Sequence, residues 1–236
     1  MIKLIKINHN FDSLVLFKDF NASFVEHKIN CIIAPSGSGK TTLLNFLSGI
    51  LKPNEGEIEN LIRPVSYVFQ DERLIGEINV HENLAFVMKE QFPDLMQRDQ
   101  RINEYLSLVD LTAVAKAYPR QLSGSMKQRL SFARAFIFRS DVLIMDEPFI
   151  GLDMKVKSKI ITNFIKLWEK DQRTVIFVTH DIDEALLVSH HISVYSDKPM
   201  KLINTHSINI PLTERKIYQP ELVDIKKDIY QDIEKW

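Results

Sequence analysis

The chain has 236 residues, of which 45% are hydrophobic and 26% are charged, so it has enough apolar material for an ordinary globular core. A formal net charge of -1 provides no general attraction to nucleic acid or to an anionic membrane surface. The sequence has no run near the roughly 18 uncharged apolar residues of a membrane span, no signal-peptide pattern at its start, and one cysteine, Cys31. We therefore expect a cytosolic protein without internal disulfides, which needs a protein partner for any function at a membrane.

The first part of the chain predicts strands and then a helix. Residues 1–33 alternate between apolar and polar side chains or form short apolar runs, with a turn near residues 8–13. The run at 29–33 predicts a buried strand that contains Cys31. Leucines at helical spacing predict a helix over residues 41–51.

The middle of the chain changes to amphipathic helical segments. A turn at residues 52–56 and a strand at 65–69 precede this change. The expected helices cover residues 80–89, 102–109 and 125–138. Together they predict a helical lobe that interrupts the series of strands.

The last part of the chain returns to short apolar strands separated by helices. The expected strands cover residues 142–145 and 174–179, and the expected helices cover 156–170 and 183–188. Apolar residues at helical spacing over 222–233 predict a packed helix in the tail. Buried strands that alternate with helices predict an α/β fold built on a mostly parallel sheet, with antiparallel strands near the N-terminus.

The segment between the buried strand at 29–33 and the first helix has the composition of a phosphate-binding loop. Gly37 and Gly39 allow backbone N–H groups to turn toward phosphate oxygens, and the following helix adds the positive end of its dipole. We expect Lys40 to contact the β- and γ-phosphates of ATP and the Thr41 hydroxyl to ligate Mg²⁺. The predicted loop comprises Ala34, Pro35, Ser36, Gly37, Ser38, Gly39, Lys40, Thr41 and Thr42.

Two acidic residues end the apolar strand at 142–145. Because successive strand side chains point to opposite faces, Asp146 and Glu147 are expected to have different roles. Asp146 suits the coordination shell of Mg²⁺. Glu147 is then free to orient and deprotonate the water that attacks the nucleotide.

A third motif narrows this general description of an NTPase to one family. The segment 122–129 precedes a predicted helix and resembles the signature motif of ABC ATPases, and its distance upstream of Asp146 fits that family. Gln70 after a strand, Asp153 at the end of Gly151-Leu152-Asp153, and His180 after another strand follow in the family's order. The resemblance covers residues 1–200, and the joint spacing of these motifs is specific.

The resemblance implies roles for residues that the spacing alone leaves open. Gln70 and His180 join Glu147 as catalytic residues, and Gln70 joins Thr41 and Asp146 around Mg²⁺. Phe11 stands where the family places an aromatic ring that stacks on adenine, and Asp153 belongs to the D-loop. The signature residues are implied to contact the ATP held by a second subunit, so that a homodimer sandwiches two ATP molecules. These signature residues are Leu122, Ser123, Gly124, Ser125 and Met126.

The resemblance also implies a P-loop NTPase (RecA-like) fold with an inserted helical subdomain. We expect one ABC ATPase domain over residues 1–236. Its nucleotide-binding core would comprise residues 1–71 and 139–210, with the helical subdomain at 72–138 and a C-terminal helical tail at 211–236.

Two positions depart from the family pattern. Ala34 replaces the first glycine of the phosphate loop, which would cost about 1 kcal/mol if that position requires a positive φ. Ser125 replaces the second glycine of the signature and adds bulk near the expected phosphate. Both changes leave open a catalytically weak regulatory ABC protein as an alternative.

The segments 69–75 and 179–185 and the turn at 196–199 resemble ABC importers of the nitrate, sulfonate and taurine group. Thiamine-precursor importers are similar here, so the cargo stays open. The resemblance implies an integral-membrane permease and an extracytoplasmic substrate-binding protein as partners. It also implies a cytoplasmic location, peripheral on the inner face of the cell membrane.

Two further ABC classes are considered. An exporter ATPase is an alternative within the family, although its Q-loop context would differ from Asp71-Glu72-Arg73-Leu74. ABC ATPases of DNA repair and chromosome maintenance carry long coiled-coil insertions between phosphate loop and signature. The short distance from Lys40 to Ser123, without sustained heptads, disfavours that nucleic-acid class.

Overall fold

Two β-sheets organise the chain, which the computed structural model describes over residues 1–151 and 154–236. The larger sheet has the strand order β5–β6–β7–β3–β8–β9. Its neighbours are parallel except for β8 and β9, which pair antiparallel at one edge. The mostly parallel sheet is therefore confirmed. Its strands are β3 (Ile29–Ile33), β5 (Ser66–Val68), β6 (Val142–Asp146), β7 (Thr174–Val178), β8 (His191–Tyr195) and β9 (Leu202–Ser207).

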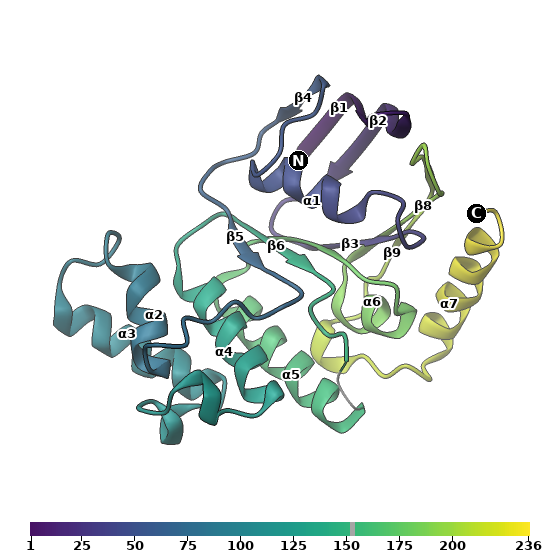
Figure 1. Cartoon of the computed structure of the whole chain (residues 1–236). Coiled ribbons are helices and arrows are strands. Elements are labelled where there is room, and N and C mark those ends of the chain that lie inside the picture. The colour runs from purple at the N-terminus through teal and green to yellow at the C-terminus, as the bar shows by residue number, and fades with distance from the viewer. Residues whose placement is uncertain (152–153) are drawn as a thin grey trace.

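The smaller sheet is antiparallel and has the order β2–β1–β4. It comprises β1 (Ile2–Phe11), β2 (Leu14–Phe24) and β4 (Glu55–Glu59). In Figure 1 it lies at the top, with helix α1 (Lys40–Ser48) between it and the larger sheet. The N-terminal antiparallel strands are thus confirmed.

The strands β3, β6, β7 and β8 of the larger sheet each contribute to two separate cores because their side chains alternate between faces. In β3, Cys31 packs in the core formed with most of the helices, whereas Ile32 packs in the core shared with α1 and the smaller sheet. Cys31 is buried, as expected. The same alternation divides Leu143 from Ile144 in β6. The sheet is therefore covered on both sides, which fixes its carboxyl edge as the place where loops are free to form a site.

Helices on the other face of the larger sheet form the predicted lobe and the last part of the chain. Figure 1 shows α2 and α3 at the left and α4 and α5 below the larger sheet. Among the described residues, no helix has the length and apolarity that a membrane crossing requires. The helices are α2 (Val80–Met88), α3 (Leu95–Leu108), α4 (Gly124–Ile137), α5 (Met154–Asp171), α6 (Ile182–Val188) and α7 (Pro220–Ile233).

Two local expectations were wrong, and two strands were missed. Helix α3 begins at Leu95 rather than near residue 102, because Asp94 caps it by accepting hydrogen bonds from two backbone N–H groups. The turn expected at 52–56 continues into β4, because pairing with β1 fixes the chain in extended form. Strands β8 and β9 were not predicted, since polar residues interrupt the short apolar run of β8 and occupy most of β9.

Candidate active site

The predicted catalytic residues gather at the carboxyl edge of the larger sheet. The phosphate loop follows β3, Glu147 follows β6, and His180 lies two residues beyond β7. Asp146 pairs in register with Val178, so Glu147 and His180 leave adjacent strands at the same level. Gln70 leaves β5 beside β6 in the same way, because Val68 pairs with Met145. Parallel strands therefore bring segments that are far apart in the chain to one edge.

The phosphate loop has the backbone that its glycines predict. Gly37 and Gly39 have φ values of 78° and 109°, in the region that favours glycine. A Cβ on Gly39 would lie 3.0 Å from the ring of Phe17, so the loop also needs glycine for close packing. Gly39 caps α1 without a side-chain hydrogen bond, which leaves the first N–H groups of the helix available to an anion.

Lys40 is buried within this loop and does not form an ion pair with any described residue. Its Nζ donates hydrogen bonds to the carbonyl oxygens of Ala34 and Pro35, both at 2.9 Å. Burial lowers the pKa of Lys40, and the nearby carboxylates of Glu147 and Asp146 oppose this shift. The ammonium group is therefore held by neutral oxygens, which phosphate oxygens can replace.

Ser38 provides a separate observation that fits a phosphate group. Its hydroxyl oxygen is buried in the loop and has no hydrogen-bond partner. An unpartnered buried hydroxyl is costly in a protein interior. It is explained if the loop binds a ligand rich in acceptor oxygens.

Thr41 and Asp146 form the part of the site that suits Mg²⁺. The Thr41 hydroxyl donates to Asp146 Oδ2 at 2.9 Å. Burial raises the pKa of Asp146, the hydrogen bond from Thr41 opposes the shift, and the charge of Glu147 adds to it. Hydroxyl and carboxylate oxygens are ligands that Mg²⁺ prefers, and here one of each converges beside the phosphate loop.

Glu147 and His180 form a direct pair. His180 Nδ1 lies 3.1 Å from Glu147 Oε2. Glu147 has a positive φ of 44°, which is unusual for a residue with a side chain. Its backbone N–H donates to the carbonyl oxygen of Val178 at 3.1 Å, which holds it in this conformation. Backbone strain of this kind is typical of functional residues.

The signature segment lies apart from these residues. Ser123 caps helix α4, where its hydroxyl accepts a hydrogen bond from the Met126 N–H at 3.3 Å. Ser123 and Gly124 are exposed, whereas Leu122 is buried and anchors the segment. The structure shows no hydrogen bond or ion pair from the signature to the described residues of the phosphate loop.

A sequence model of the ABC transporter family matches residues 17–150. The aliphatic sulfonates import ATP-binding protein SsuB of Bacillus cereus is 35% identical over 86% of this chain and 82% of its own length. The nitrate import ATP-binding protein NrtD of Synechococcus elongatus is 36% identical over 80% of this chain and 72% of its own. The chain belongs to the ABC transporter family.

A solved ABC structure extends this match to three dimensions. The dimeric, post-hydrolysis structure of the ATP-binding cassette MJ0796, bound to ADP and Pi, superposes with a TM-score of 0.76 at 28% identity. The match covers 89% of this chain and 100% of the cassette. The P-loop NTPase fold and the ATPase activity predicted from the motifs are confirmed. The relatives are import subunits, so this ABC protein is an ATPase of the importer type.

The two departures from the family pattern fit the observed backbone of this ABC ATPase. Ala34 is not among the residues with positive φ, so the cost expected for a left-handed alanine does not arise. Ser125 lies in the first turn of α4, and its hydroxyl is 3.1 Å from that of Ser123. A helical backbone accepts serine without strain.

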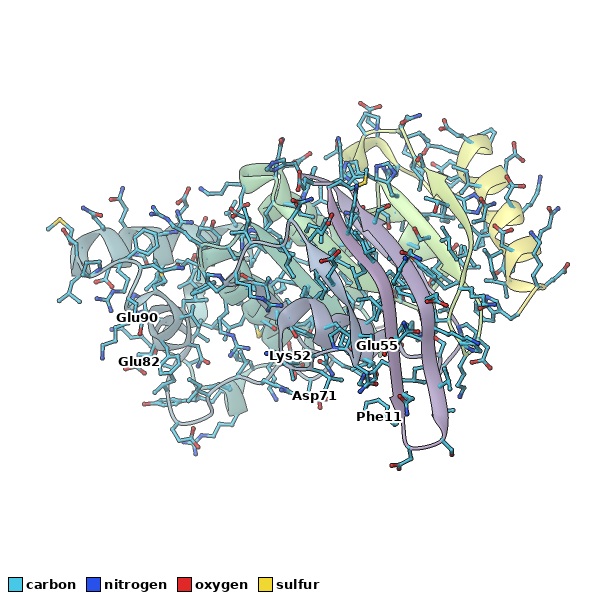
Figure 2. The ribbon with its side chains drawn as sticks, turned by 90° about the horizontal axis from the view of Figure 1, so that it is seen from above. Phe11, Lys52, Glu55, Asp71, Glu82 and Glu90 are labelled. Atoms are coloured by element: carbon cyan, nitrogen blue, oxygen red, sulfur yellow. The ribbon has the colours of Figure 1, made fainter. Side chains whose placement is uncertain are left out.

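For three predicted site residues, the described part of the chain shows no hydrogen bond to the catalytic residues of this ABC site. Gln70 is exposed and makes no hydrogen bond to the other catalytic residues. Phe11 is 48% exposed and contacts the ring of His9 edge-on, with 4.8 Å between centroids. Figure 2 shows Phe11 beside the turn of the β1–β2 hairpin. Asp153 lies outside the described residues.

The structure adds two contacts that the sequence analysis missed. Arg134 of α4 donates to the carbonyl oxygens of Glu72 and Arg73 at 2.8 and 2.7 Å. Gln128, on the same helix, donates to the carbonyl oxygen of Pro148, directly after Glu147. The signature helix is therefore joined to both the Q-loop and the catalytic loop. Both polar residues lie on a mostly buried helix, a signal that could have identified them.

Proposed function

We propose that this ABC ATPase hydrolyses ATP at the carboxyl edge of the larger sheet and thereby drives solute uptake through a separate permease. The observation that carries the mechanism is the placement of Glu147 beside His180, next to the Thr41–Asp146 pair. Glu147 orients and deprotonates the attacking water. His180 holds the Glu147 carboxylate and reaches toward the γ-phosphate.

The phosphate loop supplies binding and charge stabilisation in this proposal. Backbone N–H groups at Gly37 to Lys40 and the start of α1 surround the phosphate oxygens. Lys40 exchanges its two carbonyl partners for phosphate oxygens. When bound, Mg²⁺ neutralises the charge on the β- and γ-phosphates. Thr41 and Asp146 would hold it, with Gln70 next to the attacking water.

The second half of the proposed site comes from another copy of this chain. Ser123 and Gly124 present the exposed N-terminus of α4, the positive end of the helix dipole. The matching MJ0796 structure is dimeric. We propose that two copies sandwich two ATP molecules, each between one phosphate loop and the other copy's signature.

The permease contact is proposed on the lobe that follows Gln70. Arg73 and Glu77 are exposed, and Phe86 of α2 is 65% exposed, which offers apolar surface beside charge. Arg134 ties the Q-loop to the signature helix, so a push on this lobe reaches both halves of the site. A short cytoplasmic helix of the permease fits such a surface. The protein would then lie peripherally on the inner face of the membrane, with an extracytoplasmic binding protein delivering the cargo.

The proposed cargo is a small organic or inorganic anion of the sulfonate or nitrate type. This rests on the names of two relatives that match most of their own length, an aliphatic sulfonates importer and a nitrate importer. A spermidine/putrescine relative is 36% identical but only 54% of its length is matched. Thiamine-precursor cargo remains the alternative from the sequence.

Uptake and hydrolysis measured side by side test the proposed coupling. Charge reversal at Arg73 and Glu77 should abolish uptake of radiolabelled taurine or nitrate in cells that carry the transporter. The purified subunit should keep its ATPase activity, since neither side chain forms a hydrogen bond or ion pair with Gln70, Glu147 or His180. A parallel fall of both activities would contradict the proposed coupling surface, as would uptake that is unaffected by every change there.

A further inference from the structure

The catalytic residue His180 depends on its backbone for its position. Its side chain is 57% exposed, and its hydrogen bond in the structure is the contact with Glu147 Oε2 at 3.1 Å. Among residues 1–151 and 154–236, no second hydrogen bond or ion pair holds the ring. The segment from Thr179 to Asp181 therefore decides where the imidazole lies.

Both neighbours of His180 belong to one hydrogen-bond network. The Asp181 N–H donates to Thr179 Oγ1 at 3.1 Å, which closes a tight turn around His180. The Thr179 hydroxyl in turn donates to Glu184 Oε2 at 2.7 Å in the protein interior. Asp181 Oδ1 caps helix α6 by accepting the N–H groups of Asp183 and Glu184 at 2.9 and 3.2 Å. The turn that carries His180 is thus attached to α6 at both of its ends.

Lys157, in the first turns of α5, joins the two carboxylates of this network. Its Nζ lies 2.9 Å from Asp181 Oδ2 and 2.5 Å from Glu184 Oε1. The Glu184 side chain is only 4% exposed, so Lys157 is the cation that balances a buried charge. Helices α5 and α6 are separated by β7 in the chain. The ion pairs of Lys157 therefore fix the turn around His180 against a different part of the fold.

The charges of the network depend on one another. Burial raises the pKa of Glu184, and hydrogen bonds from Lys157 and Thr179 oppose that shift. Burial alone would lower the pKa of Lys157, but its hydrogen bonds to Glu184 and Asp181 raise it overall. Removal of Lys157 would leave Glu184 buried without a cation, so Glu184 would take up a proton and donate a hydrogen bond itself. The Glu184 carboxylate that accepts the hydrogen bond from the Thr179 hydroxyl would then be replaced by a neutral carboxyl group.

We propose that Lys157 is a positioning residue for ATP hydrolysis, which acts by holding the turn of Thr179 to Asp181 so that His180 meets Glu147. This inference rests on the proposed role of His180 in hydrolysis. Lys157 itself touches neither Glu147 nor the phosphate loop. Its effect should therefore appear in the rate of the chemical step and not in nucleotide binding.

Lys157→Met is the first test, because methionine keeps the length of the side chain and removes its charge. We expect kcat for ATP hydrolysis to fall about ten- to hundredfold, the scale of a misplaced catalytic group, with KM for ATP nearly unchanged. Lys157→Arg should retain most of the activity. Lys170→Met is the matched control, since Lys170 lies near the end of the same helix and pairs with Glu104 away from the site. Equal kcat values for Lys157→Met and Lys170→Met would overturn the proposal.

A double-mutant cycle separates this inference from the function on which it rests. In a His180→Ala background, Lys157→Met should cause no further loss of kcat, because its effect passes through His180. An equal loss in both backgrounds would contradict the role of Lys157 while leaving the role of His180 intact. If His180→Ala alone leaves kcat unchanged, the proposed mechanism of hydrolysis fails instead.

A third variant separates positioning from stability. Lys157→Met/Glu184→Gln removes the buried charge together with its cation, so its midpoint of thermal unfolding should recover toward that of the unaltered protein. Its kcat should remain low, because glutamine cannot restore the link to α5. Recovery of kcat together with stability would show that Lys157 is only structural.

Discussion

The carboxyl edge of the larger sheet, with its phosphate loop, and the N-terminus of α4, with the signature, differ in how many contacts join their predicted site residues within one chain. At the edge of the sheet, Thr41 is bonded to Asp146, and His180 is bonded to Glu147. At the signature, Ser123 and Gly124 are exposed, and the Ser123 hydroxyl contacts Ser125 and Met126 of its own helix rather than a catalytic residue. The pairs of the first region, the assembled edge, form within a single chain, whereas the second region presents an exposed helix N-terminus.

This difference indicates that the signature, rather than the phosphate loop, is where hydrolysis would be controlled. In the proposed mechanism, a single subunit already holds the groups that bind phosphate and activate water, so the rate of hydrolysis is limited by what the opposite signature adds. The proposal therefore predicts that hydrolysis is controlled by the association of two copies. The contacts of Arg134 and Gln128 with the Q-loop and catalytic loop allow that approach to reach the catalytic residues.

Glu147→Gln should give the largest effect on the assembled edge. Without the carboxylate, hydrolysis should fall by about two or more orders of magnitude, the scale of general-base catalysis. ATP binding should persist, because the phosphate loop is unchanged, and an ATP-bound dimer should accumulate. Single-turnover hydrolysis and size-exclusion chromatography with ATP measure the two effects. Near-normal turnover would remove Glu147 from the mechanism.

Lys40→Ala should lower the affinity for ATP, which Glu147→Gln should leave unchanged. Loss of a charge-assisted contact with phosphate costs about 1.5–3 kcal/mol, or roughly a 10- to 100-fold rise in Kd. A fluorescent ATP analogue measures this affinity. Lys52→Ala is the control, because Lys52 is exposed in the loop that follows α1 (Figure 2). Equal affinities in the two variants would contradict the assignment of the loop.

The assembled edge was also the region most open to prediction from sequence. Its residues follow apolar strands, and β6 and β7 ended close to where the apolar runs did. The positive φ of Glu147 was not predicted, because it results from a hydrogen bond to Val178 on the neighbouring strand. Long-range pairing of this kind has no local sequence signal.

The smaller sheet shows the same limit. The turn residues before β4 suggested that the chain stays irregular there, but Glu55 and Glu57 pair with β1 across the register of Asn8 and Ile5. Gly56 has a φ of 95°, and a Cβ there would lie 2.6 Å from the carbonyl oxygen of Lys6. The glycine thus allows a close approach between strands, which its position in the sequence could not distinguish from a turn.

Gly124→Asp tests the signature end of the comparison. The added carboxylate has open space, since no heavy atom lies within 4 Å of a Cβ built there, so the fold should be unaffected. Its negative charge at the start of α4 should repel the partner copy's γ-phosphate and lower the ATPase rate about tenfold. ATP affinity of the isolated subunit should stay constant. Gly76→Asp places the same side chain at another open glycine and should leave both values unchanged.

Ala34→Gly and Ser125→Gly should give the smallest effects, one in each region. Ala34 has no left-handed backbone to relieve, so glycine adds only freedom to the phosphate loop. Ser125 is helical, and glycine at that position weakens the helix by up to about 1 kcal/mol while removing a side chain near the partner's nucleotide. We therefore expect each ATPase rate to change only a few-fold, measured on the purified protein at saturating Mg-ATP. A large gain from Ala34→Gly would locate a weakness in the assembled edge, and a large gain from Ser125→Gly would locate it in the signature. Either gain would support the catalytically weak regulatory protein over the active importer ATPase.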